Sequence, residues 1–142
     1  MKLILTILLL LGISFSSYSK EKNFFDEAKK LYEEEKFKDS KFLFQRNIVY
    51  NPKHAKSYLY LAKIFKKEED KPEEEKNINT TLLLDPKNEE AMYLLIDIEI
   101  NRSNFSKAEE LKNDFKKICS TLCGKASSIE SRLKEFEKKD AS

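Results

Sequence analysis

The sequence of 142 residues is poor in the residues that break helices and in those that carry out common chemistry. It has two glycines, three prolines, two cysteines, one histidine and no tryptophan. Two glycines leave no room for a phosphate-binding loop and argue against β-hairpins, whose tight turns need glycine. One histidine excludes the H-E-x-x-H zinc motif, and the sequence groups no Ser/His/Asp or Cys/His residues into a catalytic pattern. We therefore predict no enzyme, no metal site and no cofactor.

Charged and helix-forming residues are abundant instead. The chain is 37% charged and 40% hydrophobic, and Lys, Glu and Leu dominate, which is typical of helical proteins. Lys and Arg number 27 against 25 Asp and Glu, for a net charge of +2. This near balance gives no overall attraction to nucleic acid, so we expect no nucleic-acid partner. The length fits one domain, and we expect that domain to be all-α.

The first nineteen residues have the pattern of a secretory signal peptide. A positively charged start precedes the apolar stretch 3–15, and Ser17 and Ser19 place small residues at −3 and −1 of a cleavage site before Lys20. The apolar stretch is shorter than the roughly 20 residues that span a bilayer. We therefore predict that 1–19 is a cleaved signal peptide, which would leave a periplasmic or cell-envelope protein. An uncleaved anchor in the inner membrane is the alternative.

A fixed period organises the chain after this segment. Asn51-Pro52-Lys53 returns 34 residues later as Asp85-Pro86-Lys87, and a period between 20 and 50 residues is the signature of a repeat array. The frame predicts three units, at 21–54, 55–88 and 89–122. The prolines should separate the units, because a helix does not continue through proline.

Within this frame the apolar and small residues recur. Positions 4, 8 and 20 of the unit hold these residues in turn: Phe24, Tyr58 and Met92; Ala28, Ala62 and Ile96; Ser40, Glu74 and Ala108. Large apolar residues at positions 4, 7 and 11 share one helical face. Small residues at positions 8 and 20 would let two helices approach closely. Charged Glu74 and Lys112 depart from the pattern.

The pattern resembles the tetratricopeptide repeat, in which two antiparallel helices, A and B, form each 34-residue unit. The segments Phe24-Phe25-Asp26-Glu27-Ala28, Phe37-Lys38-Asp39-Ser40 and Asn104-Phe105-Ser106-Lys107-Ala108 carry the resemblance. It covers residues 21–122 and implies a right-handed superhelical array of three helix pairs, of the exported bacterial type.

A final amphipathic segment follows the third unit. Ala126, Ile129, Leu133 and Phe136 lie on one helical face, and Ser127 followed by Glu130 is the pattern of a capping box. We predict a capping helix at 125–138 that covers the last repeat, as repeat arrays require. The domain would then span 20–138, with a frayed tail at 139–142.

Cys119 and Cys123 are the only cysteines. If they lie on one helix, their four-residue spacing points them the same way, which suits two buried free thiols against the capping helix. Two thiols in an oxidising compartment also suggest a disulfide. Both interpretations stay open. The lone His54 follows Pro52, and we expect it to be an exposed residue of a connecting turn.

The resemblance also implies a binding surface, because side chains of the A helices line the concave groove in that family. The residues at these positions that we take as partner-binding candidates are Phe25, Lys29, Tyr32, Lys56, Leu59, Lys63, Lys67, Tyr93 and Asp97. Lys56, Lys63 and Lys67 form a basic stripe beside aromatic side chains, which suits a protein or peptide with acidic groups. A lysine-rich face also keeps a small protein soluble, and that alternative stays open.

Three functions remain after these exclusions. The first is a non-catalytic protein-protein interaction module of the bacterial cell envelope. The second is an assembly or structural factor held at the inner membrane by an uncleaved N-terminal segment. The third, which we consider last, is a thiol redox protein that uses Cys119 and Cys123; the usual C-x-x-C spacing is absent.

Overall fold

A computed structural model describes residues 24–140, and these form seven helices with no strand among them. The helices are α2 (Phe24–Glu33), α3 (Phe37–Tyr50), α4 (Ala55–Lys67), α5 (Lys71–Leu84), α6 (Glu89–Asn101), α7 (Phe105–Ile118) and α8 (Lys125–Asp140). The all-α prediction and the expected number of helices are confirmed for this part of the chain. The predicted signal peptide and its cleavage site lie outside the described residues.

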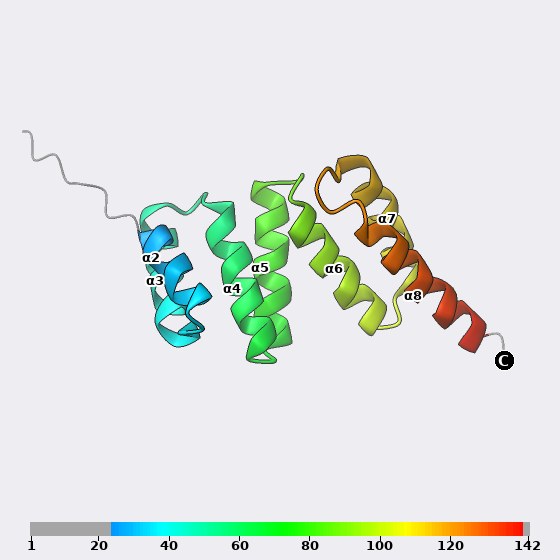
Figure 1. Ribbon diagram of the computed structural model, residues 1–142, viewed down its shortest axis with the longest axis horizontal. Helices are drawn as coiled ribbons and strands as arrows, with labels where there is room; N and C mark the ends of the chain where they lie inside the picture. The colour runs from blue at the N-terminus through cyan, green and yellow to red at the C-terminus, as the bar shows by residue number, and fades with distance from the viewer. Residues whose placement is uncertain (1–23, 141–142) are drawn as a thin grey trace, which may run out of the picture.

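The helices follow one another in chain order along the long axis, with α2 and α3 at one end and α7 and α8 at the other (Figure 1). Contacts are most extensive within the pairs α2–α3, α4–α5 and α6–α7, and each pair packs on the next. Helix α8 packs against α7 and α6. The buried apolar side chains form two clusters, one across α2, α3 and α4 and the other from α4 to α8, so no helix pair encloses a core of its own.

The 34-residue period recurs in the backbone. Helices α3, α5 and α7 each have 14 residues, and they begin 34 residues apart. The turns before them contain the only non-glycine residues with positive φ in the described chain, Glu35, Glu69 and Ser103, at 59°, 60° and 60°. These residues are also 34 apart. A left-handed backbone conformation is costly for residues with a Cβ. Its recurrence at these three positions shows that the same tight turn joins the two helices of each pair.

Local sequence explains where the helices stop and start. Pro52 and Pro86 lie in the turns between α3 and α4 and between α5 and α6, as predicted. Pro72 lies in the first turn of α5, where its missing N–H is not needed. The Asp70 carboxylate caps that helix by accepting a hydrogen bond from the Glu73 amide at 3.2 Å. These signals are local and could all be seen in the sequence.

Small residues do bring the paired helices close together. Ala28, Ala62 and Ala108 are completely buried, and the Ser40 hydroxyl of α3 donates to the Ala28 carbonyl of α2 at 2.8 Å. A side chain of one helix thus hydrogen-bonds the backbone of its partner. Glu74 occupies the equivalent position of α5 and is also buried, with 6% of its surface exposed. This burial raises the pKa of the Glu74 carboxyl above its usual value.

Two predictions about the last helix are wrong. The Ser127 hydroxyl does not cap α8; it donates to the Gly124 carbonyl at 3.0 Å, because the helix begins two residues earlier, at Lys125. The helix also ends at Asp140, two residues beyond the predicted end at 138. Lysine and glutamate at the end of the chain favour helix and extend it.

Candidate functional site

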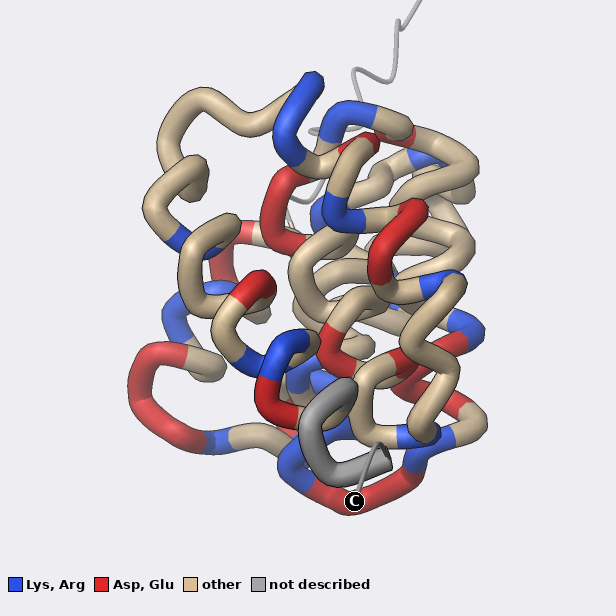
Figure 2. The backbone as a smooth tube through the Cα atoms, turned by 90° about the vertical axis from the view of Figure 1, so that its right-hand side faces the viewer, with Lys and Arg blue, Asp and Glu red and all other residues tan. Residues whose placement is uncertain are grey.

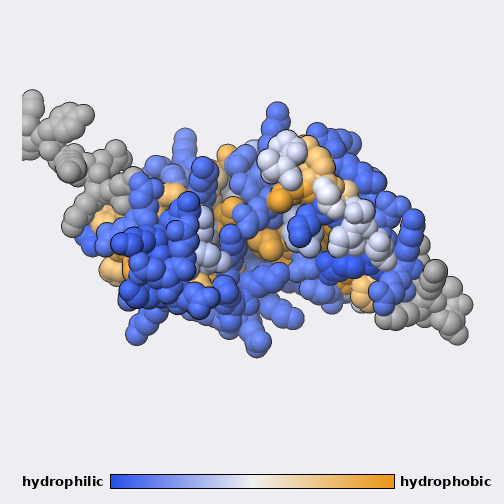
Figure 3. Space-filling view, in the orientation of Figure 1, coloured by the Kyte–Doolittle hydropathy of each residue, from blue (hydrophilic) through white to orange (hydrophobic). Residues whose placement is uncertain are grey.

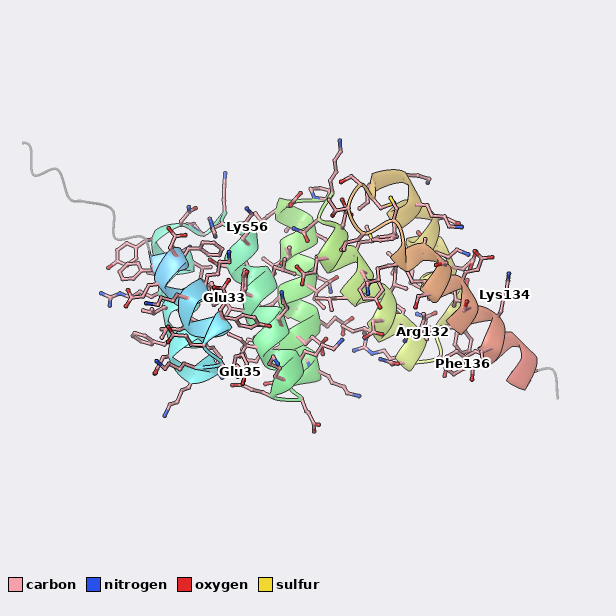
Figure 4. The ribbon with its side chains drawn as sticks, viewed as in Figure 1. Glu33, Glu35, Lys56, Arg132, Lys134 and Phe136 are labelled. Carbon is pink, nitrogen blue, oxygen red and sulfur yellow. A yellow bond between two sulfur atoms is a disulfide. The ribbon has the colours of Figure 1, made fainter. Side chains whose placement is uncertain are left out.

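A cavity of about 500 Å³ lies between α2, α4 and α6, and we call it the groove. Its lining comes from three helices, the turn before α6 and the loop after α7. The lining residues are Phe25, Lys29, Lys56, Leu59, Tyr60, Asp85, Lys87, Asn88, Glu89, Glu90, Thr121 and Leu122. Lys56 projects from the start of α4 (Figure 4). The groove thus combines aromatic, apolar and charged side chains from segments far apart in the sequence.

The aromatic wall of the groove is held rigidly. The Phe25 ring of α2 lies 5.8 Å from the Tyr60 ring of α4, and both contact the Phe44 ring of α3, at 5.6 and 4.9 Å between centroids. Edge-to-face and offset contacts of this kind stabilise aromatic clusters beyond their burial alone. A partner would therefore meet a preformed apolar surface.

His54 lies in the connecting turn before α4, as predicted, but it is partly buried and not exposed. Its ring lies 4.6 Å from the Phe25 ring, and its Nδ1 lies 2.9 Å from the Ser57 hydroxyl. Partial burial, together with the nearby Lys56, lowers the pKa of His54 below its usual value. The residue therefore helps to position the aromatic wall.

Lys63 does not belong to a free basic stripe. Its ammonium lies 2.7 Å from the Glu90 carboxylate of α6 and 4.9 Å from the centre of the Tyr60 ring. Burial is the largest single influence on Lys63 and opposes its protonation, but the hydrogen bond and charge attraction to Glu90, with smaller contributions from Tyr32 and Tyr60, together outweigh it and raise the lysine pKa. Lys67 lies over the Phe37 ring, at 4.7 Å from its centre. These two side chains mainly connect helices of the array.

Lys56 and Lys87 are the groove lysines that form no ion pair with the described residues. Lys29 forms only an exposed contact with Glu33 at 3.6 Å, in a geometry that is usually worth little. Over the molecule as a whole, basic and acidic residues are interleaved along the chain (Figure 2). The positive charge available to a partner in the groove is therefore concentrated at Lys56 and Lys87.

The structure brings together four of the nine candidate residues. Phe25, Lys29, Lys56 and Leu59 line the groove. The other five do not; they are Tyr32, Lys63, Lys67, Tyr93 and Asp97. Asp97 instead binds Lys66 and Arg132, both at 2.8 Å, and Arg132 reaches it from α8 (Figure 4). It borders a second cavity of about 420 Å³ near the far end of α6.

The groove also contains Lys87, Tyr60 and the loop after α7, which the repeat pattern did not indicate. Lys87 lies in the turn after Pro86, outside the A helix on which the groove positions were sought. The repeated Pro-Lys of Pro52-Lys53 and Pro86-Lys87 was visible, but only the second lysine lines the groove. Nothing local indicated that the loop would fold back to α6.

The loop after α7 is closed by a disulfide between Cys119 and Cys123. Cys123 is exposed and Cys119 is partly buried, so the expectation of two buried free thiols is wrong. Helix α7 ends at Ile118, and the chain then turns tightly enough to bring the two Cα atoms to 5.1 Å. That separation falls within the range that a disulfide bridges.

Glu89, the first residue of α6, is bound by this loop. Its carboxylate accepts hydrogen bonds from the Ser120 hydroxyl at 2.6 Å and from the Ser120 and Leu122 amides at 2.8 and 2.7 Å. These donors lower the pKa of Glu89 to about 2. The carboxylate thus fixes the loop at one side of the groove.

No protein-family model matches this chain, and no curated protein shows significant similarity to it. Among the helices within residues 24–140, none combines the length and the apolar character needed to cross a membrane. Over the same residues, no three His, Cys, Asp or Glu side chains are grouped as metal ligands would be.

Proposed function

We propose that this chain is a non-catalytic protein-binding module of the tetratricopeptide type, exported to the bacterial cell envelope. Three helix pairs would form a right-handed superhelical array, and α8 would cover its last apolar face. The observation that carries the proposal is the groove, which places an aromatic wall beside Lys56 and Lys87, two lysines that form no ion pair with any residue in 24–140.

The proposed type of repeat rests on the recurrence of the same turn every 34 residues, at Glu35, Glu69 and Ser103. The contact of small residues between paired helices, such as Ala28 with Ser40, supports the same assignment. Stacked helix pairs of this kind provide extended surfaces that bind other chains. The fold alone does not define the partner, and the groove must do so.

The partner is an extended protein segment with acidic and apolar side chains. Lys56 and Lys87 offer positive charge in the groove lining, and Phe25, Leu59 and Tyr60 offer apolar contact. Electrostatic complementarity of this kind sets orientation and rate of association. The hydropathy surface in Figure 3 shows apolar patches in the middle of this face and around the loop after α7, within a mainly polar surface.

The compartment follows from the N-terminal pattern and is supported by the Cys119–Cys123 bond, because disulfides persist in oxidising compartments. N-terminal sequencing of protein isolated from the envelope tests this step. A mature end at Lys20 is expected. An intact Met1 would favour instead the factor anchored at the inner membrane.

Binding is tested by selecting peptides from a displayed random library on the purified protein and measuring their affinity by fluorescence anisotropy. Selected peptides should be rich in Asp, Glu and apolar residues. Lys56→Glu should weaken their binding about tenfold, because it replaces attraction with repulsion, and higher salt should also weaken it. Phe25→Ala should weaken binding through loss of the aromatic wall.

Lys38→Glu is the matched control, because Lys38 is exposed on α3 and does not line the groove. It makes the same change of charge at a distant place and should leave affinity unchanged. Equal losses for Lys38→Glu and Lys56→Glu would show that only net charge matters. Such a result would remove the groove as the binding site.

A further inference from the structure

The loop that follows α7 holds an anion in a way that depends on its closed shape. The amides of three successive residues, Ser120, Thr121 and Leu122, all donate to the Glu89 carboxylate, at 2.8, 3.0 and 2.7 Å. Consecutive N–H groups converge on one anion only where the backbone is curved into a concave nest. The disulfide joins the two ends of this curve, Cys119 and Cys123.

The same loop forms one wall of the groove. Glu89, Thr121 and Leu122 all line the cavity, and Leu122 also packs against the main hydrophobic core. Next to Glu89 in the chain, Glu90 binds Lys63 of α4 at 2.7 Å. The disulfide, the loop, the start of α6 and the groove are thus joined through a continuous set of contacts.

We propose that the Cys119–Cys123 disulfide is a redox latch on the groove: its reduction releases the loop from Glu89, removes one wall and weakens partner binding. The coupling of the disulfide to Glu89 depends only on the loop. The effect on partner binding rests on the proposed function. Once the bond is broken, the chain from 119 to 123 gains conformational freedom, and holding three amides on one carboxylate then costs more entropy.

The reductant is a dithiol. One of its thiolates attacks the sulfur of Cys123, which is exposed, and Cys119 leaves as a thiolate. The second thiol of the reductant then attacks the mixed disulfide and releases Cys123. Two electrons pass from the dithiol to the protein, two protons pass to the cysteine thiolates, and the reductant becomes its own disulfide.

The latch has a reciprocal consequence that can be measured without a partner. If the closed loop favours ionised Glu89, then ionised Glu89 must favour the closed loop by the same factor. Glu89→Gln should therefore shift the thiol-disulfide equilibrium with dithiothreitol toward the reduced form, by about fivefold or more. The other charged groups of the cavity are unchanged in this comparison; they are Lys29, Lys56, Asp85, Lys87 and Glu90.

The first experiment measures the pKa of Glu89 and the solvent exchange of the amides that bind it, in the purified protein before and after reduction with dithiothreitol. Carboxyl ¹³C titration should place the pKa of Glu89 near 2 in the oxidised protein and higher in the reduced protein. Exchange of the Thr121 and Leu122 amides with solvent should be at least tenfold faster after reduction. Equal titrations and equal exchange rates would overturn the latch, as would two free thiols in the air-oxidised protein.

Cys119→Ser/Cys123→Ser is the control and should resemble the reduced protein in the presence and absence of dithiothreitol. If this double variant does not fold, the equilibrium of Glu89→Gln with dithiothreitol still decides the question, since that variant retains both cysteines. An unchanged equilibrium for Glu89→Gln would overturn the coupling.

The second experiment measures the affinity of a peptide selected on the oxidised protein. Reduction should weaken its binding about fivefold or more, and Lys38→Glu should show the same redox effect as the unmodified protein. Equal affinity for both redox states would overturn the gating of the groove while leaving the proposed function intact. Failure to select any groove-binding peptide would contradict both the proposed function and the redox effect on partner binding. The Glu89 titration would still decide whether the disulfide is coupled to Glu89.

Discussion

At the scale of single residues, neighbours decide what a given side chain does. Lys56 and Lys63 lie on the same helix, two turns apart. Lys63 forms an ion pair with Glu90, whereas Lys56 forms none with the residues that the structure describes. Glu74 and Ala62 both lie at helix contacts, but burial of the Glu74 carboxyl raises its pKa and opposes its charge. Residue type alone therefore overestimates how much of the lysine-rich helix can bind a partner.

Replacement of Ser103 by glycine should stabilise the folded protein. Its φ of 60° is left-handed, which costs an L-residue about 1–2 kcal/mol, and the greater flexibility of unfolded glycine offsets about half of this. Ser103→Gly should raise the free energy of unfolding by about 0.5–1 kcal/mol, measured by urea denaturation. Gln45→Gly, in the exposed middle of α3, should lower it by a similar amount. A loss of stability at Ser103 would contradict the closed-turn geometry.

At the scale of helices, α8 belongs to the core although it follows the last complete pair. Ile129 and Leu133 join the same buried cluster as Ile96 of α6 and Phe115 of α7, and the Phe136 ring stacks on Phe105 at 5.0 Å. Without α8 these apolar faces of α6 and α7 would meet water. The helix therefore covers the apolar faces of α6 and α7 at this end of the molecule.

Ile129→Ala should lower the free energy of unfolding by about 2–5 kcal/mol, because the side chain is completely buried and its removal leaves a cavity. Chemical denaturation followed by circular dichroism would measure the loss. Val49→Ala is the control, since Val49 is 77% exposed and its truncation should change stability by no more than about 0.5 kcal/mol. Similar small effects at both positions would show that α8 is not part of the cooperative core.

At the scale of the whole molecule, ion pairs connect consecutive pairs of the array along one side. Asp97 of α6 accepts from Lys66 of α4 and from Arg132 of α8, both at 2.8 Å. Burial, the largest single influence, raises the pKa of Asp97, but the hydrogen bonds and charge attraction of Lys66 and Arg132 together outweigh it, so the net pKa is lowered. One carboxylate thus connects three helices, through partners that lie 31 and 35 positions from it in the sequence.

Asp97→Asn should lower the free energy of unfolding by about 1–2 kcal/mol at neutral pH, since it weakens two charge-assisted hydrogen bonds that are partly exposed. Because the folded pKa of Asp97 is lowered, this contribution is present above the usual aspartate pKa of about 4. It disappears as pH falls through the lower folded value. Denaturation at pH 7 and at pH 3 should show the difference shrinking.

The control is Asp114→Asn, which affects an exposed pair with Lys117 within α7. It should change stability by no more than about 0.5 kcal/mol at either pH. Equal effects of the two substitutions at pH 7 would show that Asp97 does not connect the array.

The sequence by itself determined the helix boundaries at Pro52 and Pro86 and the small residues at helix contacts, because each depends on a few neighbouring residues. It also determined the period, because similar segments recur 34 residues apart. Only the tertiary structure decided that Glu90 neutralises Lys63 and that Glu89 binds the loop at Ser120, because these partners lie 27 and 31 residues apart. Their contact depends on the register between helices, which a pattern along one helix does not specify. Four of the nine candidate residues line the groove for the same reason: the pattern identified the face of each helix, and the packing of the helices decided which side chains of that face reach the cavity.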